Sequence, residues 1–153
     1  MHASAPIART ILVVEDDRTT RLLVATYLAQ AGYQVLEAGR VREGVAAFED
    51  RSIDLMIVDG LLPDGTGMEV IRTFRERGHS APIIFVSAFF KARQGHEVLS
   101  QQLGVSGILE KPLDPDRLLA EVQKALLSGS KTADATQNLG NASSGVSLPT
   151  AGI

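Results

Sequence analysis

The sequence of 153 residues has no cysteine and no tryptophan, and its only histidines are His2, His79 and His96. Without cysteine the protein can form no disulfide, no thiolate nucleophile and no zinc–thiolate centre. The three histidines share no spacing typical of metal ligands. Thiol redox chemistry and zinc chemistry are therefore excluded as functions.

Long hydrophobic runs are absent as well. The apolar runs Ile11–Val14 and Leu55–Val58 are only a few residues long, whereas a membrane-spanning helix needs about 20 apolar residues. The first residues also lack the apolar stretch of a secretory signal peptide. The sequence therefore predicts a cytoplasmic protein that does not enter a membrane.

The chain has no excess of positive charge. Its 15 Lys and Arg residues stand against 18 Asp and Glu residues, which gives a formal net charge of -3 at pH 7. Binding nucleic acid through charge requires a clustered positive face, and the arginines here are scattered. We therefore expect no direct contact with nucleic acid.

Residues 128–153 differ in composition from the rest of the chain. They consist mostly of Ser, Gly, Thr, Ala and Asn and contain no aromatic residue, so they cannot bury a hydrophobic core. We expect one folded domain in residues 1–127, a common size for a domain, followed by a disordered tail or linker in residues 128–153.

Five short apolar segments recur along the predicted domain. They are Ile11–Val14, Val35–Leu36, Leu55–Val58, Ile83–Val86 and Ile108–Leu109. Several are apolar at successive positions, which is typical of parallel strands covered by helices on both faces. A sheet with one wet face would instead alternate between apolar and polar residues.

The stretches between and after these segments have apolar residues at helical spacing. Five helices are indicated by Leu22, Leu23, Leu28 and Ala31 before Gly32, by Val41, Val45 and Phe48, by the capping-box spacing Thr66–Glu69, by Val98, Leu99 and Leu103, and by Asp114 before Pro115. Gly65 and Gly67 are interpreted as ordinary loop and helix-start glycines. Five strand–helix units predict an α/β protein with a doubly wound, five-stranded parallel sheet of the (βα)5, flavodoxin-like kind.

In such a sheet the ligand site lies at the carboxyl ends of the strands. The chain places Glu15, Asp16, Asp59, Ser87 and Lys111 there. Two carboxylates about 4 Å apart repel each other by about 4 kcal/mol at an effective dielectric constant near 20, so a converging group of three needs a cation. Oxygen ligands without His or Cys favour Mg²⁺.

The same residues suit phosphoryl transfer to a carboxylate. Asp59 would attack phosphorus in line, Mg²⁺ and Lys111 would hold two phosphoryl oxygens, and Ser87 would donate a hydrogen bond to the third. The product would be an acyl phosphate.

Four segments, in order, resemble the receiver domain of bacterial two-component response regulators, the family that includes the chemotaxis regulators. They are ILVVEDD, DLMIVDGLLPDGTGMEVI, APIIFVSA and GVSGILEKPL, and the resemblance covers residues 10 to 127. It implies that Asp59 accepts the phosphoryl group and that Mg²⁺ is bound by Glu15, Asp16, Asp59 and the backbone carbonyl of Leu61. It also implies that Ser87 is the switch hydroxyl, that Lys111 is the lysine of the site, and that the bond to Pro112 is cis.

The resemblance also implies the partners of the protein. A sensor histidine kinase or a phosphotransfer protein would supply the phosphoryl group, and an unidentified output protein would recognise the phosphorylated form. Such a domain is not a conventional enzyme, although it catalyses its own phosphorylation and dephosphorylation at Asp59. No output motif follows residue 127, so the chain is either a single-domain regulator or ends in the linker of a longer protein.

One position departs from the family pattern. Three residues before Lys111 the family commonly has Tyr or Phe, which swings inward on activation, and this chain has Ile108. The aromatic switch cannot operate in its usual form. We expect Ile108 to pack and the readout to depend on backbone movement after Ser87.

Three alternative functions are weighed against this interpretation. A nucleotide-binding enzyme would need glycine-rich backbone amides after the first strand, where this chain has EDDRTTR. A phosphatase of the haloacid dehalogenase type would need an acid at position 61, which is Leu61. A pseudo-receiver, an interaction module that accepts no phosphoryl group, is favoured only by Ile108.

Overall fold

The computed structural model describes residues 7–88 and 98–128. Its main sheet has five strands in the order β2-β1-β3-β6-β7, and every neighbouring pair is parallel. The strands are β1 (Thr10–Val14), β2 (Gln34–Ala38), β3 (Leu55–Asp59), β6 (Ile83–Ser87) and β7 (Gly107–Glu110). This order confirms the predicted doubly wound, flavodoxin-like parallel sheet. Of the predicted tail, residues 129–153 lie outside the described residues, and Ser128 is helical.

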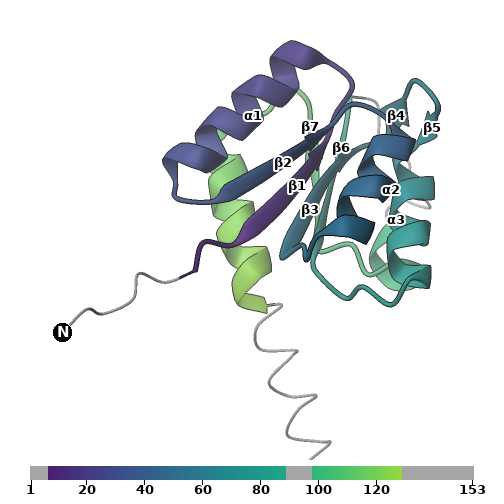
Figure 1. Ribbon diagram of the computed structural model, residues 1–153. Helices are drawn as coiled ribbons and strands as arrows, with labels where there is room; N and C mark the ends of the chain where they lie inside the picture. Colours follow the sequence, from purple (N-terminus) through teal and green to yellow (C-terminus); the bar gives the residue numbers. More distant parts are fainter. Residues whose placement is uncertain (1–6, 89–97, 129–153) are drawn as a thin grey trace, which may run out of the picture.

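Helices cover both faces of the sheet (Figure 1). They are α1 (Arg18–Gln30), α2 (Val41–Asp50), α3 (Gly67–Glu76) and a helix over residues 115–128. Helix α1 and the helix 115–128 pack on one face, and α2 and α3 pack on the other. Where Val98, Leu99 and Leu103 predict the fourth helix, the structure has a short π-helical segment, Val98–Gln102. Residues 89–97 before it lie outside the described residues.

The central strands are buried on both faces, as their continuous apolar runs predict. Along β1, Ile11 and Val13 belong to the core on the side of α1, and Leu12 and Val14 belong to the core on the side of α2. Successive side chains of a strand point to opposite faces, so each must be apolar when helices cover both. No helix of the described residues is long and apolar enough to cross a membrane.

The predicted apolar face of α1 was wrong in part. The helix forms where expected and ends before Gly32, which has a positive φ of 97°. However, Leu22 and Leu23 are 59% and 49% exposed, and the buried positions are Val24, Ala25 and Leu28. A helix turns by about 100° per residue, so a stripe centred on Val24 and Leu28 leaves Leu22 facing outward.

Side chains cap most of the helices. The Asp17 carboxylate accepts from the Thr20 amide at 2.9 Å, and the Thr66 hydroxyl accepts from the Glu69 amide at 3.3 Å, as the capping-box spacing predicts. Asp114 accepts from the Arg117 amide at 3.3 Å and begins the helix 115–128. These bonds satisfy amides that have no partner within the helix.

A short hairpin that the sequence analysis did not predict follows β3. Its strands are β4 (Leu61–Leu62) and β5 (Gly65–Thr66), which pair antiparallel. Two-residue strands are too short to show a periodic pattern, so the sequence carries no signal for them.

Arg75 ties three segments together at the amino edge of the sheet. Its guanidinium donates to the carbonyls of His79 and Ala81 before β6 and of Leu103 and Gly104 before β7, at 2.8 to 3.2 Å. Burial lowers the pKa of Arg75. The pKa of an arginine ordinarily lies so far above neutral pH that the side chain still stays charged. One side chain of α3 thus holds the starts of two strands.

We predict that Arg75→Met lowers the free energy of unfolding by about 2 kcal/mol, because it removes charge-assisted hydrogen bonds that water only partly replaces. Arg72→Met is the matched control, since Arg72 is an exposed arginine of the same helix. Urea unfolding followed by circular dichroism measures both. Equal stability of the two variants would contradict the role of Arg75.

Candidate functional site

The predicted site residues meet at the carboxyl edge of the sheet. Glu15 follows β1, Asp59 ends β3, Ser87 ends β6 and Lys111 follows β7. Backbone bonds set their relative positions: the Gly60 amide donates to the Val86 carbonyl at 2.9 Å, and the Lys111 amide donates to the Ser87 carbonyl at 3.1 Å.

Three acids form one cluster there. Glu15, Asp16 and Asp59 each place a carboxylate oxygen within 4.8 Å of the others. Glu15 and Asp59 are only 4% and 8% exposed, whereas Asp16 is exposed at the rim. The cluster therefore has two carboxylates inside the protein and one that water can reach.

Lys111 neutralises part of this charge. Its ammonium group donates to Glu15 Oε1 and, at 3.0 Å, to Asp59 Oδ2. The peptide bond between Lys111 and Pro112 is cis, as the family resemblance implied. The two bonds place Lys111 between the two buried acids.

The environment separates the pKa values of the two buried acids. Burial, together with the neighbouring Asp59, raises the pKa of Glu15 to about 8 against the effect of Lys111. Burial also pushes the pKa of Asp59 upward, but its interactions with the neighbouring Glu15 and Lys111 outweigh burial and hold that pKa below its usual value. These surroundings therefore favour the ionised form of Asp59 and disfavour the ionised form of Glu15.

The cluster fits a hard divalent cation. Glu15 Oε2 is buried and has no hydrogen-bond partner among the described residues, which is a costly state for a carboxyl oxygen. Carboxylate oxygens are the ligands that Mg²⁺ takes from proteins, usually one or two with water completing the shell. The residues present therefore suit a metal that would give this oxygen a partner.

Ile108 lies next to the site and packs, as expected. It is half-buried and contacts the core that contains Leu12, Val58 and Phe85. It therefore fills space in β7 three residues before Lys111.

The sequence analysis missed the role of Gly67. A Cβ atom added at this residue would lie 2.2 Å from the Asp59 carbonyl oxygen, and no real Cβ comes that close. Its amide donates to the Gly60 carbonyl at 3.0 Å. The interpretation of Gly67 as an ordinary helix-start glycine was wrong, because the start of α3 contacts the backbone of Asp59 directly.

Arg21 is a second residue that the sequence analysis missed. Its guanidinium donates to the Glu15 carbonyl at 2.8 Å and forms an ion pair with Glu37 on β2. It thereby fixes the backbone of Glu15 from α1. No local pattern indicates this contact, because it depends on how α1 crosses β1 and β2.

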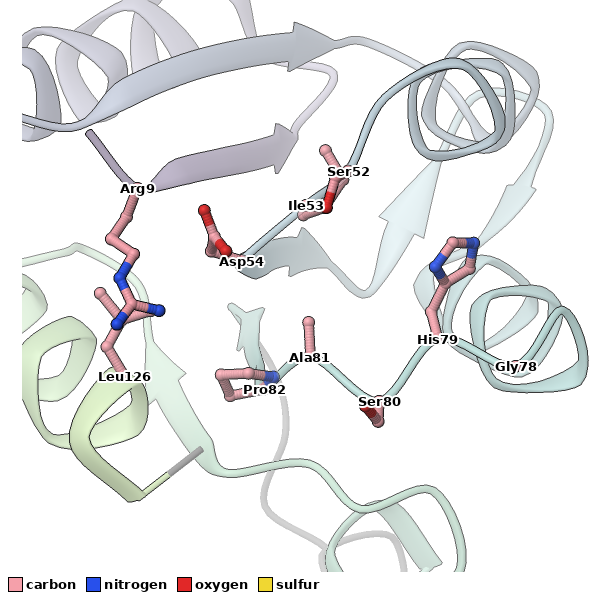
Figure 2. A pocket seen from close by; sticks show the side chains of 10 residues that line it. All are labelled: Arg9, Ser52, Ile53, Asp54, Gly78, His79, Ser80, Ala81, Pro82 and Leu126. Atoms are coloured by element: carbon pink, nitrogen blue, oxygen red, sulfur yellow. The ribbon is translucent and has the colours of Figure 1, made fainter. Parts of the chain in front are cut away.

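A cavity of about 370 Å³ lies at the opposite, amino edge of the sheet (Figure 2). Arg9 extends toward Leu126 on one side of it, and the His79 imidazole stacks on Phe74 with ring centroids 4.7 Å apart. The Asp54 carboxylate accepts from the Thr10 amide at 2.7 Å. The residues that line this cavity include none of the acidic cluster, so the cavity is separate from the candidate site.

Comparison with known proteins decides the family. The family model for the response regulator receiver domain matches residues 11–123. The chain belongs to this family. The receiver domain is similar to a Pseudomonas aeruginosa protein, the phosphate regulon transcriptional regulatory protein PhoB, with 31% identity over 122 residues that cover 78% of the chain and 52% of the relative. The chain thus spans about half the length of that relative.

Solved structures agree with this assignment. A CheY-like response regulator receiver domain protein from Methanospirillum hungatei superposes with a TM-score of 0.73 and 28% identity, covering 82% of this chain and 98% of that one. The response regulator TrrA from Thermotoga maritima, solved in complex with Mg(2+)-BeF, has a TM-score of 0.68 and 27% identity, covering 76% of this chain and 98% of that one. The receiver domain of two-component systems is therefore the correct description of this chain.

We predict that Gly67→Ala lowers the free energy of unfolding by about 1–3 kcal/mol, because the new methyl group forces the backbone of Asp59 or α3 to move. Gly107→Ala is the control, since a Cβ there would first meet the flexible end of Glu121 at 3.1 Å. Thermal unfolding of both variants measures the difference. A Gly67→Ala variant as stable as Gly107→Ala would contradict the close packing.

Proposed function

We propose that this receiver domain accepts a phosphoryl group on Asp59 in a Mg²⁺-dependent reaction and that the modification switches a surface for an output protein. The ionised carboxylate of Asp59, held between Lys111 and two further acids at the end of β3, carries the proposal. A buried ionised carboxylate bonded to a lysine is a nucleophile with a cation already beside it.

Glu15, Asp16 and Asp59 would hold the metal, with the Leu61 carbonyl as a further ligand. Mg²⁺ would supply positive charge for the phosphoryl oxygens and a fixed geometry for the transfer. The arrangement of Glu15 and Asp16 supports this assignment, because each places a carboxylate oxygen within 4.8 Å of one from Asp59.

Asp59, Lys111 and Ser87 would each have a separate role in the phosphoryl transfer. An Asp59 oxygen forms a new bond to phosphorus while the bond between phosphorus and the donor's leaving atom breaks. Lys111, already bonded to Asp59, would move its ammonium group onto a phosphoryl oxygen. The Ser87 hydroxyl, at the end of the neighbouring strand, would donate to another oxygen once the phosphoryl group is present.

The phosphoryl donor would be a sensor histidine kinase or a phosphotransfer protein. Such a donor must bring its phosphohistidine to Asp59 and therefore contacts the rim of the site. An apolar cavity of about 460 Å³ lies there, between α1 and the segment after β7, lined by Leu23, Tyr27 and Leu113. Because Leu23 is 49% exposed, this apolar rim suits the donor protein.

The pseudo-receiver alternative has little support. Lys111 is bonded to Glu15 and Asp59, and Asp16 lies close to both acids. Ile108, the only sequence feature that favours a pseudo-receiver, is half-buried and packs against the core. No feature of the described residues identifies the output protein. The surface of the receiver domain that it binds would include β7 and the helix 115–128.

We predict that acetyl phosphate with Mg²⁺ adds one phosphoryl group to the protein and that Asp59→Asn abolishes the addition, since an amide cannot form the acyl phosphate. Asp54→Asn is the control, because Asp54 lies at the opposite edge of the sheet and should leave labelling unchanged. Intact-protein mass spectrometry detects the addition. Full labelling of Asp59→Asn would refute the assignment of the acceptor.

We predict that Leu23→Asp slows transfer from a phosphorylated histidine phosphotransfer protein at least tenfold, because burying a new charge against the donor is unfavourable. Labelling by acetyl phosphate, which needs no protein contact, should stay within twofold of the parent. Ala29→Asp places the same charge farther along α1 and is the control. Equal slowing with both donors would mean that Leu23 affects the site and not the docking.

A further inference from the structure

The hairpin β4–β5 begins two residues after Asp59 and contains Leu61, whose carbonyl is proposed to bind Mg²⁺. At its base the Gly67 amide donates to the Gly60 carbonyl at 3.0 Å, and the Leu61 amide donates to Asp59 Oδ1 at 3.4 Å. A pair of two-residue strands cannot hold its own shape in water. The orientation of the Leu61 carbonyl therefore depends on contacts between the hairpin and the rest of the domain.

Asp64, at the tip of the hairpin, makes the polar contacts of this kind. One carboxylate oxygen accepts from the Val41 amide at 2.7 Å, and the other accepts from the Arg42 amide at 3.1 Å. Both amides belong to the first turn of α2, where the preceding Arg40 provides no side-chain cap. Asp64 thus caps a helix that lies 23 residues earlier in the chain.

Apolar contacts also hold the hairpin against the domain on the side of α2. Leu62 is 8% exposed and belongs to the core on the side of α2. Gly65 lies against Val41, because a Cβ atom added there would be 3.1 Å from Val41 Cγ2. The hairpin therefore lies against the start of α2. Among the described residues, the two hydrogen bonds of Asp64 are the directional contacts that fix the hairpin relative to this helix.

We infer that Asp64 is a positioning residue for the metal site: by fastening the hairpin to the N-terminus of α2 it holds the Leu61 carbonyl in place to bind Mg²⁺. The inference rests on the proposed function. Asp64 itself touches neither the metal nor the phosphoryl group, and it acts through the backbone of residues 61–64. Groups that orient a metal ligand in this way typically change metal affinity by 10-fold or more.

The test measures Mg²⁺ binding by isothermal titration calorimetry on the full chain. Asp64→Ala should weaken Mg²⁺ binding about tenfold, and Asp64→Asn, which keeps one acceptor oxygen, should lie between this variant and the parent. With acetyl phosphate, Asp64→Ala should need more Mg²⁺ for half-maximal labelling and should reach the parental rate when Mg²⁺ is saturating. A purely structural role would not produce this rescue.

Asp54→Ala is the matched control, since it also removes an aspartate that accepts a backbone amide, at the opposite edge of the sheet. It should lower the melting temperature without changing Mg²⁺ affinity. If Asp64→Ala and Asp64→Asn are folded and bind Mg²⁺ as tightly as the parent, the inference is wrong and the proposed function stands. If the parent itself binds no Mg²⁺, both are wrong.

Discussion

Two buried carboxyl groups sharing one ammonium group are the constraint on which the rest of this protein depends. Glu15 and Asp59 lie at the ends of neighbouring strands, and Lys111 contacts both. Without that cation the two acids would repel each other within a site that water hardly reaches. The strand order β2-β1-β3-β6-β7 allows the contact, because it sets β1 and β3 side by side and ends β7 at the same edge.

The sequence predicts the five strands and the central acids well, for a physical reason. A strand covered on both faces must be apolar at every position, so Leu55–Val58 is visible without knowledge of the fold. Parallel strands bring their carboxyl ends together, so Glu15, Asp59 and Lys111 could be placed in one site from their positions alone. The structure brings these residues together, but the roles of all the site residues, including the Ser87 hydroxyl and the Leu61 carbonyl, stay predictions.

Contacts between distant segments are what the sequence did not predict. Asp64 caps α2 from a later hairpin, Arg21 reaches back to the Glu15 carbonyl, and Gly67 is required by the approach of another backbone. In each case the local sequence pattern is ordinary, and the structural role of the residue depends on which helix or strand packs beside it. The outward-facing Leu22 is the same kind of error, since helical spacing alone does not choose which of two apolar stripes is buried.

The open edges of the sheet limit how copies of this chain can associate. An edge strand offers unpaired backbone groups that another chain can extend into a larger sheet. On β2 the exposed side chains include Gln34 and Glu37, and Glu37 is paired with Arg21, while β7 ends in the exposed Glu110. Polar and charged side chains along these strands oppose edge-to-edge stacking and aggregation. Extension of the sheet by a second copy of the chain is therefore unfavourable, and the five strands stay a closed frame for the site.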